Sequence, residues 1–259
     1  VIKSQQTERG ISTGRLSSSG PNLQQIPTRT NEGKLLREIF IPEKGNILID
    51  ADYSQIEPRL VAHFSQDPFL LNVYKNNLDI YSQLVEGTGR ERNDGKTFML
   101  ALLYGAGAKK LARNFKCSEE EAQSILDSIN KKIVGVTAWI NRVKYEARQK
   151  KGVYTIMKRW IPIPGIASND LYERYHWERT AVNYTIQGSA AEIIKLAMIQ
   201  LKKKGFLPIL TVHDELLFEA DKNNSAYLAQ DIKSMMESIV PLSVPLVAEV
   251  GIGINWREA

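Results

Sequence analysis

Cysteine is nearly absent from this sequence, since Cys117 is the single one among 259 residues. A lone cysteine excludes a disulfide within the chain and a zinc site built from cysteines alone. The sequence also lacks a signal peptide and any apolar run of about 18 residues, the length that a membrane-spanning helix needs. Its 43% hydrophobic and 24% charged residues distinguish it from disordered and collagen-like chains. We therefore expect a globular protein with one large domain or two lobes.

Neither sign of charge dominates the sequence. Lys and Arg number 34 against 29 Asp and Glu, which gives a formal net charge of +5. Such a mild excess permits a nucleic-acid or phosphate partner without establishing one. The first residues are polar and include no initiator methionine. We therefore expect a soluble intracellular protein, without a membrane partner, that is part of a longer polypeptide.

The distribution of apolar residues predicts strands near both ends of the chain and helices between them. Residues 1–34 are rich in turn-forming residues and predict turns with short strands, whereas about 57–204 is mainly helical. This order predicts an α+β fold in which a large helical insertion interrupts an antiparallel sheet. The expected strands are 47–49, a hairpin of 209–212 and 215–218, and 246–254. The expected helices are 92–104, one that starts after the capping box Ser118–Glu121, 188–204 and 225–240. A loop is expected at 152–170.

Two acids stand at the ends of predicted strands. Asp52 follows the apolar run 47–49, and Asp214 lies in the predicted hairpin turn. If the strands are neighbours, the two carboxylates converge and could bind Mg²⁺ through oxygen ligands. Solvated turn acids give the same pattern, and Asp50 shares the strand face of Asp52, so the pattern alone does not choose between them. Strand alternation predicts that Glu215 turns away from Asp214, as does His213.

A stripe of side chains runs along the predicted helix 92–104. Arg92, Lys96, Leu100 and Tyr104 are spaced by four residues and therefore share one helix face. Two cations followed by apolar and aromatic groups suit a ligand with a polyphosphate at one end and a flat ring at the other. A solvated basic edge on a buried helix would give the same spacing.

Seven segments, in order along nearly the whole chain, carry short sequence motifs. They are Thr13–Ser19, Pro21–Pro27, Asp52–Glu57, the stripe on helix 92–106, Asn183 with Gln187 and Gly188, Val212–Leu216 and Val250–Trp256. Together they resemble the polymerase domain of family A DNA polymerases, the bacterial DNA polymerase I type. The segment from Asp52 to Glu57 resembles motif A of that family, the stripe resembles motif B, and Val212–Leu216 resembles motif C.

The resemblance implies a right-hand polymerase fold that lacks the thumb. The palm would be residues 1–61 and 188–259, and the fingers 62–187. The implied reaction is template-directed addition of deoxynucleoside triphosphates to a primer 3′-hydroxyl, with release of pyrophosphate, in DNA replication or repair. Two Mg²⁺ ions, with Mn²⁺ as an alternative, would be the cofactors. The partners would be primer–template DNA and a thumb, with or without an exonuclease segment, from a longer parent chain or a second chain.

The resemblance also assigns roles to individual residues. It selects Asp52 over Asp50 and adds Asp214 and the backbone carbonyl of Tyr53 as metal ligands, with Glu215 as a secondary acid. Arg92 and Lys96 would act on the triphosphate, and Glu57 would exclude a ribose 2′-hydroxyl. The other implied nucleotide contacts are Leu100, Tyr104, Gln55 and Tyr81. The implied DNA contacts are Arg15, Asn183, Gln187, His213, Arg29 and Arg179.

Three positions depart from the family pattern. Leu100 stands where an aromatic residue is usual, Ala101 replaces a usual glycine, and Tyr81 replaces a usual histidine. Leucine keeps apolar contact but loses stacking area. We expect altered nucleotide affinity and altered discrimination against dideoxy analogues, while the Tyr81 hydroxyl substitutes for the imidazole. The loop 155–160 is also poorer in Gly and Arg than usual.

Other functions remain open from the sequence. A single-subunit RNA polymerase would share the palm, although Glu57 argues against it. A metal-dependent phosphohydrolase could use His63, His213 and Asp214. The chain could also be a thumb-less fragment that acts only as a DNA-binding module. The expected location is the cytoplasm or nucleoid of a bacterium or phage-infected cell, with an organelle as a further possibility.

Overall fold

The computed structural model describes residues 5–7, 11–28 and 30–259. The chain divides into two compact units. The first comprises the described parts of Val1–Ile56 together with Ala190–Pro241 and Leu246–Ala259, and the second comprises Glu57–Ser189 and Leu242–Pro245. The palm and fingers boundaries at 61/62 and 187/188 remain a prediction. No helix of the described residues is long and apolar enough to cross a membrane.

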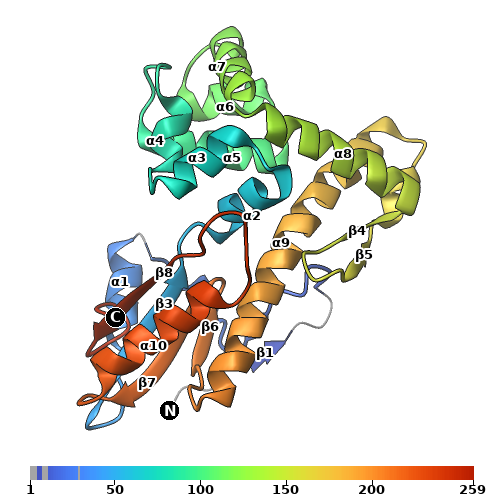
Figure 1. Ribbon diagram of the computed structural model, residues 1–259. Coiled ribbons are helices and arrows are strands. Elements are labelled where there is room, and N and C mark those ends of the chain that lie inside the picture. Colours follow the sequence, from blue (N-terminus) through green and yellow to red (C-terminus); the bar gives the residue numbers. More distant parts are fainter. Residues whose placement is uncertain (1–4, 8–10, 29) are drawn as a thin grey trace. The chain divides into compact units, whose positions relative to one another are not determined.

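A four-stranded antiparallel sheet forms the centre of the first unit (Figure 1). Its strand order is β6-β7-β3-β8, with β3 at Asn46–Tyr53, β6 at Leu210–Val212, β7 at Glu215–Asp221 and β8 at Ala248–Gly253. Strand β3 lies inside the sheet because its apolar side chains need cover on both faces. Helix α10, Ser225–Ser238, packs across the sheet against β8 and β3. The antiparallel sheet and the tight hairpin at His213–Asp214 are confirmed.

The N-terminal part of this unit contains one helix that the sequence did not indicate. Two short strands are present as expected, β1 at Gln5–Thr7 and β2 at Ser17–Ser19, and they pair with each other; a 3-10 turn η1 follows at Leu23–Gln25. Helix α1, Asn31–Glu38, begins after Thr30, whose hydroxyl accepts from the Gly33 amide at 3.1 Å. The expectation of turns and short strands for residues 1–34 was therefore wrong from residue 31 onward. Leu35 and Leu36 are exposed, so α1 has no apolar stripe that would reveal it.

The second unit is mainly helical. Its helix α5, Arg92–Tyr104, has the bounds that the sequence predicted, and the side chain of Ser118 caps α7 through the Glu121 amide at 3.0 Å. The other elements are α2 Ile56–Ser65, α3 Pro68–Lys75, α4 Ile80–Val85, α6 Ala108–Phe115, α7 Glu119–Lys132, α8 Val134–Lys150, β4 Gly152–Tyr154, β5 Trp160–Pro162 and η2 Pro164–Ala167.

Helix α9, Leu171–Lys203, is longer than predicted because it begins well before Gly188. The expected loop 152–170 in turn contains the β4–β5 hairpin. A Cβ at Gly188 would lie 2.8 Å from the Thr155 side chain and 2.9 Å from that of Ile161. Gly188 thus allows the hairpin to pack on the helix and does not mark its start. The Ser189 hydroxyl accepts from the Ile156 amide at 2.9 Å and stabilises the same contact between the hairpin and the helix.

Candidate active site

Several acids meet at one edge of the four-stranded sheet. Strand β3 pairs with β7 so that Asp52 lies opposite Glu215, and Asp214 precedes Glu215 in the turn. The Tyr53 amide donates to the Asp214 carbonyl at 3.3 Å, which joins the turn to β3. His213 adopts φ 58° as the first residue of the two-residue turn. The structure thereby brings together the two strand ends that carry Asp52 and Asp214.

Negative charge accumulates around Asp52. Burial of the carboxylate, then the charges of Asp214 and two nearby glutamates, raises the pKa of Asp52 to about 7. The glutamates are Glu215 and Glu249, which both lie opposite Asp52 on the neighbouring strands. Asp52 is nevertheless an exposed position of β3. An ion or a phosphate group can therefore reach it, and a cation there would relieve the repulsion.

Glu215 lies close to the other acids, opposite Asp52, although strand alternation predicted that it would turn away from Asp214. Asp214 belongs to the turn, so the strand alternation starts only at Glu215. Burial, and then the charge and hydrogen bond of Glu215, raises the pKa of Asp50 to about 8. The Oδ1 atom of Asp50 is buried without a hydrogen-bond partner. Asp50, which the resemblance left without a role, is thus the neighbour of Glu215.

The donor set at this edge fits a hard cation that shares its coordination with a substrate. Mg²⁺ is commonly held by one or two carboxylates, with water and substrate phosphates completing its shell. Asp52 and Asp214 supply two such carboxylates. Among the described residues, no group of three or more His, Cys, Asp or Glu side chains is arranged to hold a metal ion. The carbonyl of Tyr53 as a further ligand remains a prediction.

Arg92 at the start of α5 is paired with an acid in this structure. Its guanidinium donates two hydrogen bonds to the Asp79 carboxylate, both at 3.0 Å, and lies 5.3 Å from the centre of the Tyr81 ring. Asp79 also caps α4, because it accepts from the Ser82 amide at 2.9 Å and the Ser82 hydroxyl at 2.8 Å. Although partial burial opposes it, these bonds hold the pKa of Asp79 below its usual value.

The remaining stripe of α5 points away from the buried side of the helix. Lys96 is half-buried, and Leu100 and Tyr104 are exposed to 40% and 38%. The Tyr104 hydroxyl donates to Glu57 Oε2 at 3.2 Å and lies 3.3 Å from Gln187 Nε2, which donates to it. Three residues that were predicted to serve the nucleotide or the DNA therefore form one hydrogen-bonded chain.

Tyr81 is buried beside this helix, with 8% of its surface exposed, and burial raises the pKa of its hydroxyl. A Cβ at Gly95 would overlap the Tyr81 carbonyl oxygen, so α4 and α5 approach closely at this point. The guanidinium of Arg92 lies over the Tyr81 ring. The contact of the Tyr81 hydroxyl with a nucleotide remains a prediction.

The predicted DNA-contacting residues of α9 form a stripe beside the end of α5. Arg179, Asn183 and Gln187 are spaced by four residues along the helix. A Cβ at Gly105, where α5 ends with φ 65°, would overlap the side chain of Arg179. Gln187 reaches Tyr104 as described above. The structure thus brings Arg179 and Gln187 to the end of the helix that carries Lys96.

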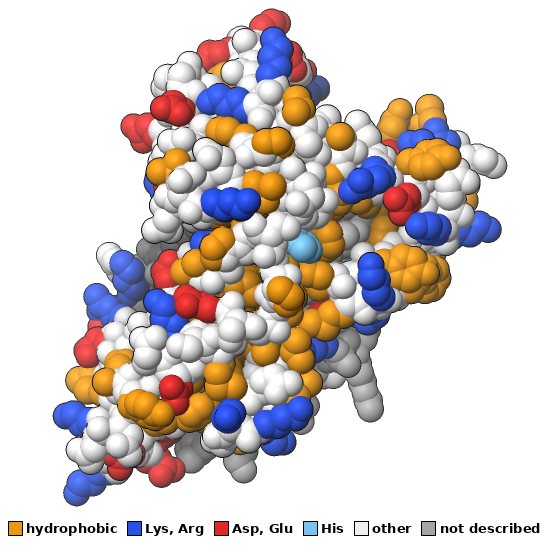
Figure 2. All heavy atoms as spheres, viewed as in Figure 1, with side chains coloured by type: hydrophobic (Ala, Val, Ile, Leu, Met, Phe, Trp, Pro, Cys, Tyr) orange, Lys and Arg blue, Asp and Glu red, His pale blue; other side chains and the backbone are white. Residues whose placement is uncertain are grey.

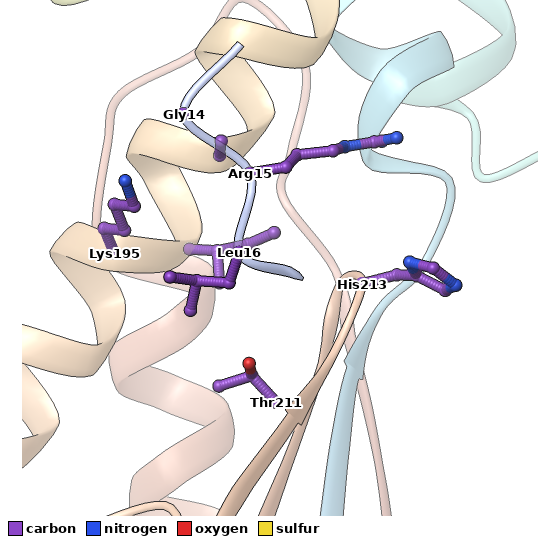
Figure 3. A pocket seen from close by; sticks show the side chains of 8 residues that line it. Gly14, Arg15, Leu16, Lys195, Thr211 and His213 are labelled. Atoms are coloured by element: carbon purple, nitrogen blue, oxygen red, sulfur yellow. The ribbon is translucent and has the colours of Figure 1, made fainter. Parts of the chain in front are cut away.

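The first unit has a small pocket of about 20 Å³ between the residues around Arg15, α9 and the β6–β7 hairpin. Arg15 and His213 extend toward the same side of it, whereas Lys195 of α9 points elsewhere (Figure 3). This places together two of the predicted DNA contacts. Gln55 lies in the turn after β3 with φ 56°. Arg29 lies outside the described residues.

Sequence patterns missed several residues near the palm acids. Arg37 and Trp256 both bind Glu215, and Glu249 lies opposite Asp52. Trp256 belongs to a recognised motif, but nothing in the sequence gave it a partner. Arg37 is one cation in a short polar helix and carries no signal. His63, considered for a phosphohydrolase, accepts from the Ser243 amide at 3.1 Å, which gives that alternative no support.

The sequence profile of DNA polymerase family A matches residues 1–258. The chain belongs to DNA polymerase family A. It is 41% identical over 266 residues to DNA polymerase I of Caldicellulosiruptor bescii, and 39% identical over 265 residues to the thermostable DNA polymerase I of Thermus aquaticus. Each alignment covers 97% of this chain but only 31% and 32% of those relatives.

A solved structure supports the same family A assignment. The POL domain of Pol1 from M. smegmatis, in complex with DNA primer-template and dNTP, matches with a TM-score of 0.93 and 36% sequence identity. The match covers 100% of this chain and 48% of that one. The predicted family and the α+β fold are therefore confirmed. The reported relatives are bacterial, which gives an organellar origin no support.

Proposed function

We propose that this chain is the nucleotide-transferring part of a template-directed DNA polymerase. It would add deoxynucleoside triphosphates to a primer 3′-hydroxyl and release pyrophosphate. The observation that carries the proposal is the proximity of Asp52 and Asp214 at one sheet edge, where burial and then the charge of Asp214 raise the pKa of Asp52 to about 7. The family relatives named DNA polymerase I support a role in bacterial DNA replication or repair.

Asp52 and Asp214 are the residues that would hold two Mg²⁺ ions, or Mn²⁺ in their place. Such ions supply positive charge that activates an attacking oxygen and stabilises a leaving one. The exposed position of Asp52 suits ligands shared with substrate phosphates. Glu215 would act as a secondary acid, held back from direct coordination by its bonds within the palm. Ionised Asp52 is the form that this role requires.

On α5, Lys96 and Arg92 would bind the triphosphate. Phosphoryl transfer asks a protein mainly for positioning and charge stabilisation, which two cations on a rigid helix can supply. Arg92 would exchange its Asp79 partner for phosphate oxygens. Leu100 and Tyr104 would lie along the sugar and base. Glu57, fixed by the Tyr104 hydroxyl, would leave no room for a ribose 2′-hydroxyl.

Primer–template DNA would be bound mainly by polar and basic side chains. Arg15, Asn183 and Gln187 can donate to the purine N3 and pyrimidine O2 acceptors that every correct pair offers in the minor groove. His213 would hold the primer terminus, while Arg29 and Arg179 would contact the backbone or line the site. We further propose that a thumb outside these 259 residues, in the same polypeptide or in a second chain, completes the grip on DNA.

Primer extension by the full-length protein with Mg²⁺ tests this function. Asp52→Asn and Asp214→Asn should each reduce extension by about a thousandfold or more, because each removes charge needed in the transition state. Asp127→Asn, on the exposed side of α7, is the matched control and should extend normally. Normal extension by both palm variants would refute the metal assignment. Preferential use of ribonucleotides would instead favour a single-subunit RNA polymerase, and binding without extension a DNA-binding module.

A further inference from the structure

Glu215, the first residue of β7, is held by groups from three separate segments. Both of its carboxylate oxygens accept from the Arg37 guanidinium of α1 at 3.4 Å. Its Oε1 also accepts from the indole N–H of Trp256 at 2.5 Å. Asp50 on β3 shares a further hydrogen bond with it. Only 12% of the Glu215 side chain is exposed, so its carboxylate is committed to contacts within the palm.

Arg37 is placed to serve this carboxylate. The residue is 8% exposed, and its guanidinium lies 4.1 Å from the centre of the Trp256 ring. Its Nε atom is buried without a hydrogen-bond partner. A buried cation is costly unless it is paired, so Arg37 and Glu215 depend on each other. The positive charge of the guanidinium also acts on Asp50, where it partly opposes the rise in pKa.

Trp256 is itself fixed firmly by its surroundings. The residue is 1% exposed, its amide donates to the Phe40 carbonyl at 3.0 Å, and its ring meets that of Phe40 edge-to-face at 5.3 Å. A Cβ at Gly251 or Gly253 would overlap the backbone at Ala259. The C-terminal turn therefore packs directly on β8, and this packing determines where the indole N–H points.

We propose that Arg37 and Trp256 are positioning residues that hold Glu215 and, through the chain, its neighbour Asp214. This inference rests on the proposed polymerase function. Asp214 lies between the exposed His213 and the anchored Glu215, so the anchor on one side fixes where its carboxylate stands relative to Asp52. Neither positioning residue needs to touch the substrate. The C-terminal turn thus takes part in assembling the metal-binding edge.

The Trp256→Phe variant tests the idea because it removes the N–H without changing charge. We measure Mn²⁺ binding to the full-length protein by electron paramagnetic resonance, and kcat, KM for nucleotide and primer–template Kd separately. Loss of a charge-assisted hydrogen bond should weaken Mn²⁺ binding about tenfold and lower kcat about tenfold. KM and the DNA Kd should stay within about twofold. The matched control is Trp139→Phe, a buried tryptophan in the other unit, which should change none of these.

A double-mutant cycle distinguishes positioning through Glu215 from a general loss of structure. In a Glu215→Ala background, Trp256→Phe should have no further effect on Mn²⁺ binding. Additive losses, or Trp256→Phe behaving like its control, would overturn the proposal. If Trp256→Phe fails to fold, Arg37→Lys is measured in the same cycle and must give the same pattern. Failure of the wild-type protein to extend a primer would refute the polymerase function alone, since Mn²⁺ binding is measured without DNA.

Discussion

At the scale of single residues, the palm edge concentrates carboxylates around one buried arginine. Asp50, Asp52 and Glu215 interact directly through their charges, and Asp214 and Glu249 add to the field at Asp52. Natural proteins tolerate such repulsion where function needs it and stability elsewhere offsets it. The acids proposed to bind a cation are consequently the ones that should destabilise the metal-free fold.

A pH-dependent stability measurement tests this directly. Because the folded-state pKa of Asp52 is raised from 3.8 to about 7, its contribution is most favourable below pH 3.8 and is lost as pH rises through about 7. In EDTA, Asp52→Asn should melt at a temperature close to wild type at acidic pH, and above wild type by roughly 2 °C or more at alkaline pH. Asp127→Asn should show no such trend. A gap that does not vary with pH would contradict the raised pKa.

The exchange of Arg92 between Asp79 and a phosphate makes a second residue-scale prediction. Asparagine at position 79 can still cap α4, but it weakens the ion pair with Arg92. An exposed pair of this kind is worth roughly 0.2–1 kcal/mol. Asp79→Asn should therefore lower KM for deoxynucleotides by about two- to fivefold in steady-state primer extension. An unchanged or higher KM would mean that Arg92 does not leave Asp79 to bind the nucleotide.

At the scale of elements, strong local sequence patterns predicted helices and strands correctly, whereas tertiary contacts could not be predicted from the sequence. Helix α5 was predicted from its composition and spacing, and the β6–β7 hairpin from two apolar runs around a tight turn. Helix α9 was cut at Gly188, since a glycine that allows close packing looks like one that ends a helix. The acids at strand ends could be singled out because their position follows from a local apolar pattern. Arg37 could not, because its contacts are with residues that are distant in the sequence.

Gly95 provides an element-scale prediction. A methyl group there would meet the backbone of Tyr81 and push α4 away from α5. Gly95→Ala should lower the free energy of unfolding by about 1–3 kcal/mol in urea denaturation, and should raise KM for nucleotide because Arg92 loses its support. Gly107→Ala is the control, since no atom lies within 4 Å of its added carbon and its φ is −80°. Equal stability of the two variants would contradict the close contact.

At the scale of the whole molecule, the face seen in Figure 2 carries charge of both signs. The view in Figure 2 shows Lys and Arg side chains interspersed with Asp and Glu. The net charge of +5 is correspondingly modest for a protein proposed to hold DNA. Selected contacts, such as the Arg15 and His213 pocket and the α9 stripe, would have to provide specific binding.

The chain alone should therefore bind DNA weakly. It matches only 48% of the M. smegmatis POL domain chain, which was solved with primer–template. Fewer phosphate contacts mean fewer released counterions and a shallower dependence of affinity on salt. In fluorescence anisotropy with one primer–template, we expect the 259-residue chain to bind about tenfold or more weakly than that POL domain, with a smaller slope of log K against log salt. Equal salt-dependence slopes for the two proteins would show that these 259 residues already carry the full set of phosphate contacts. DNA binding would then need no thumb.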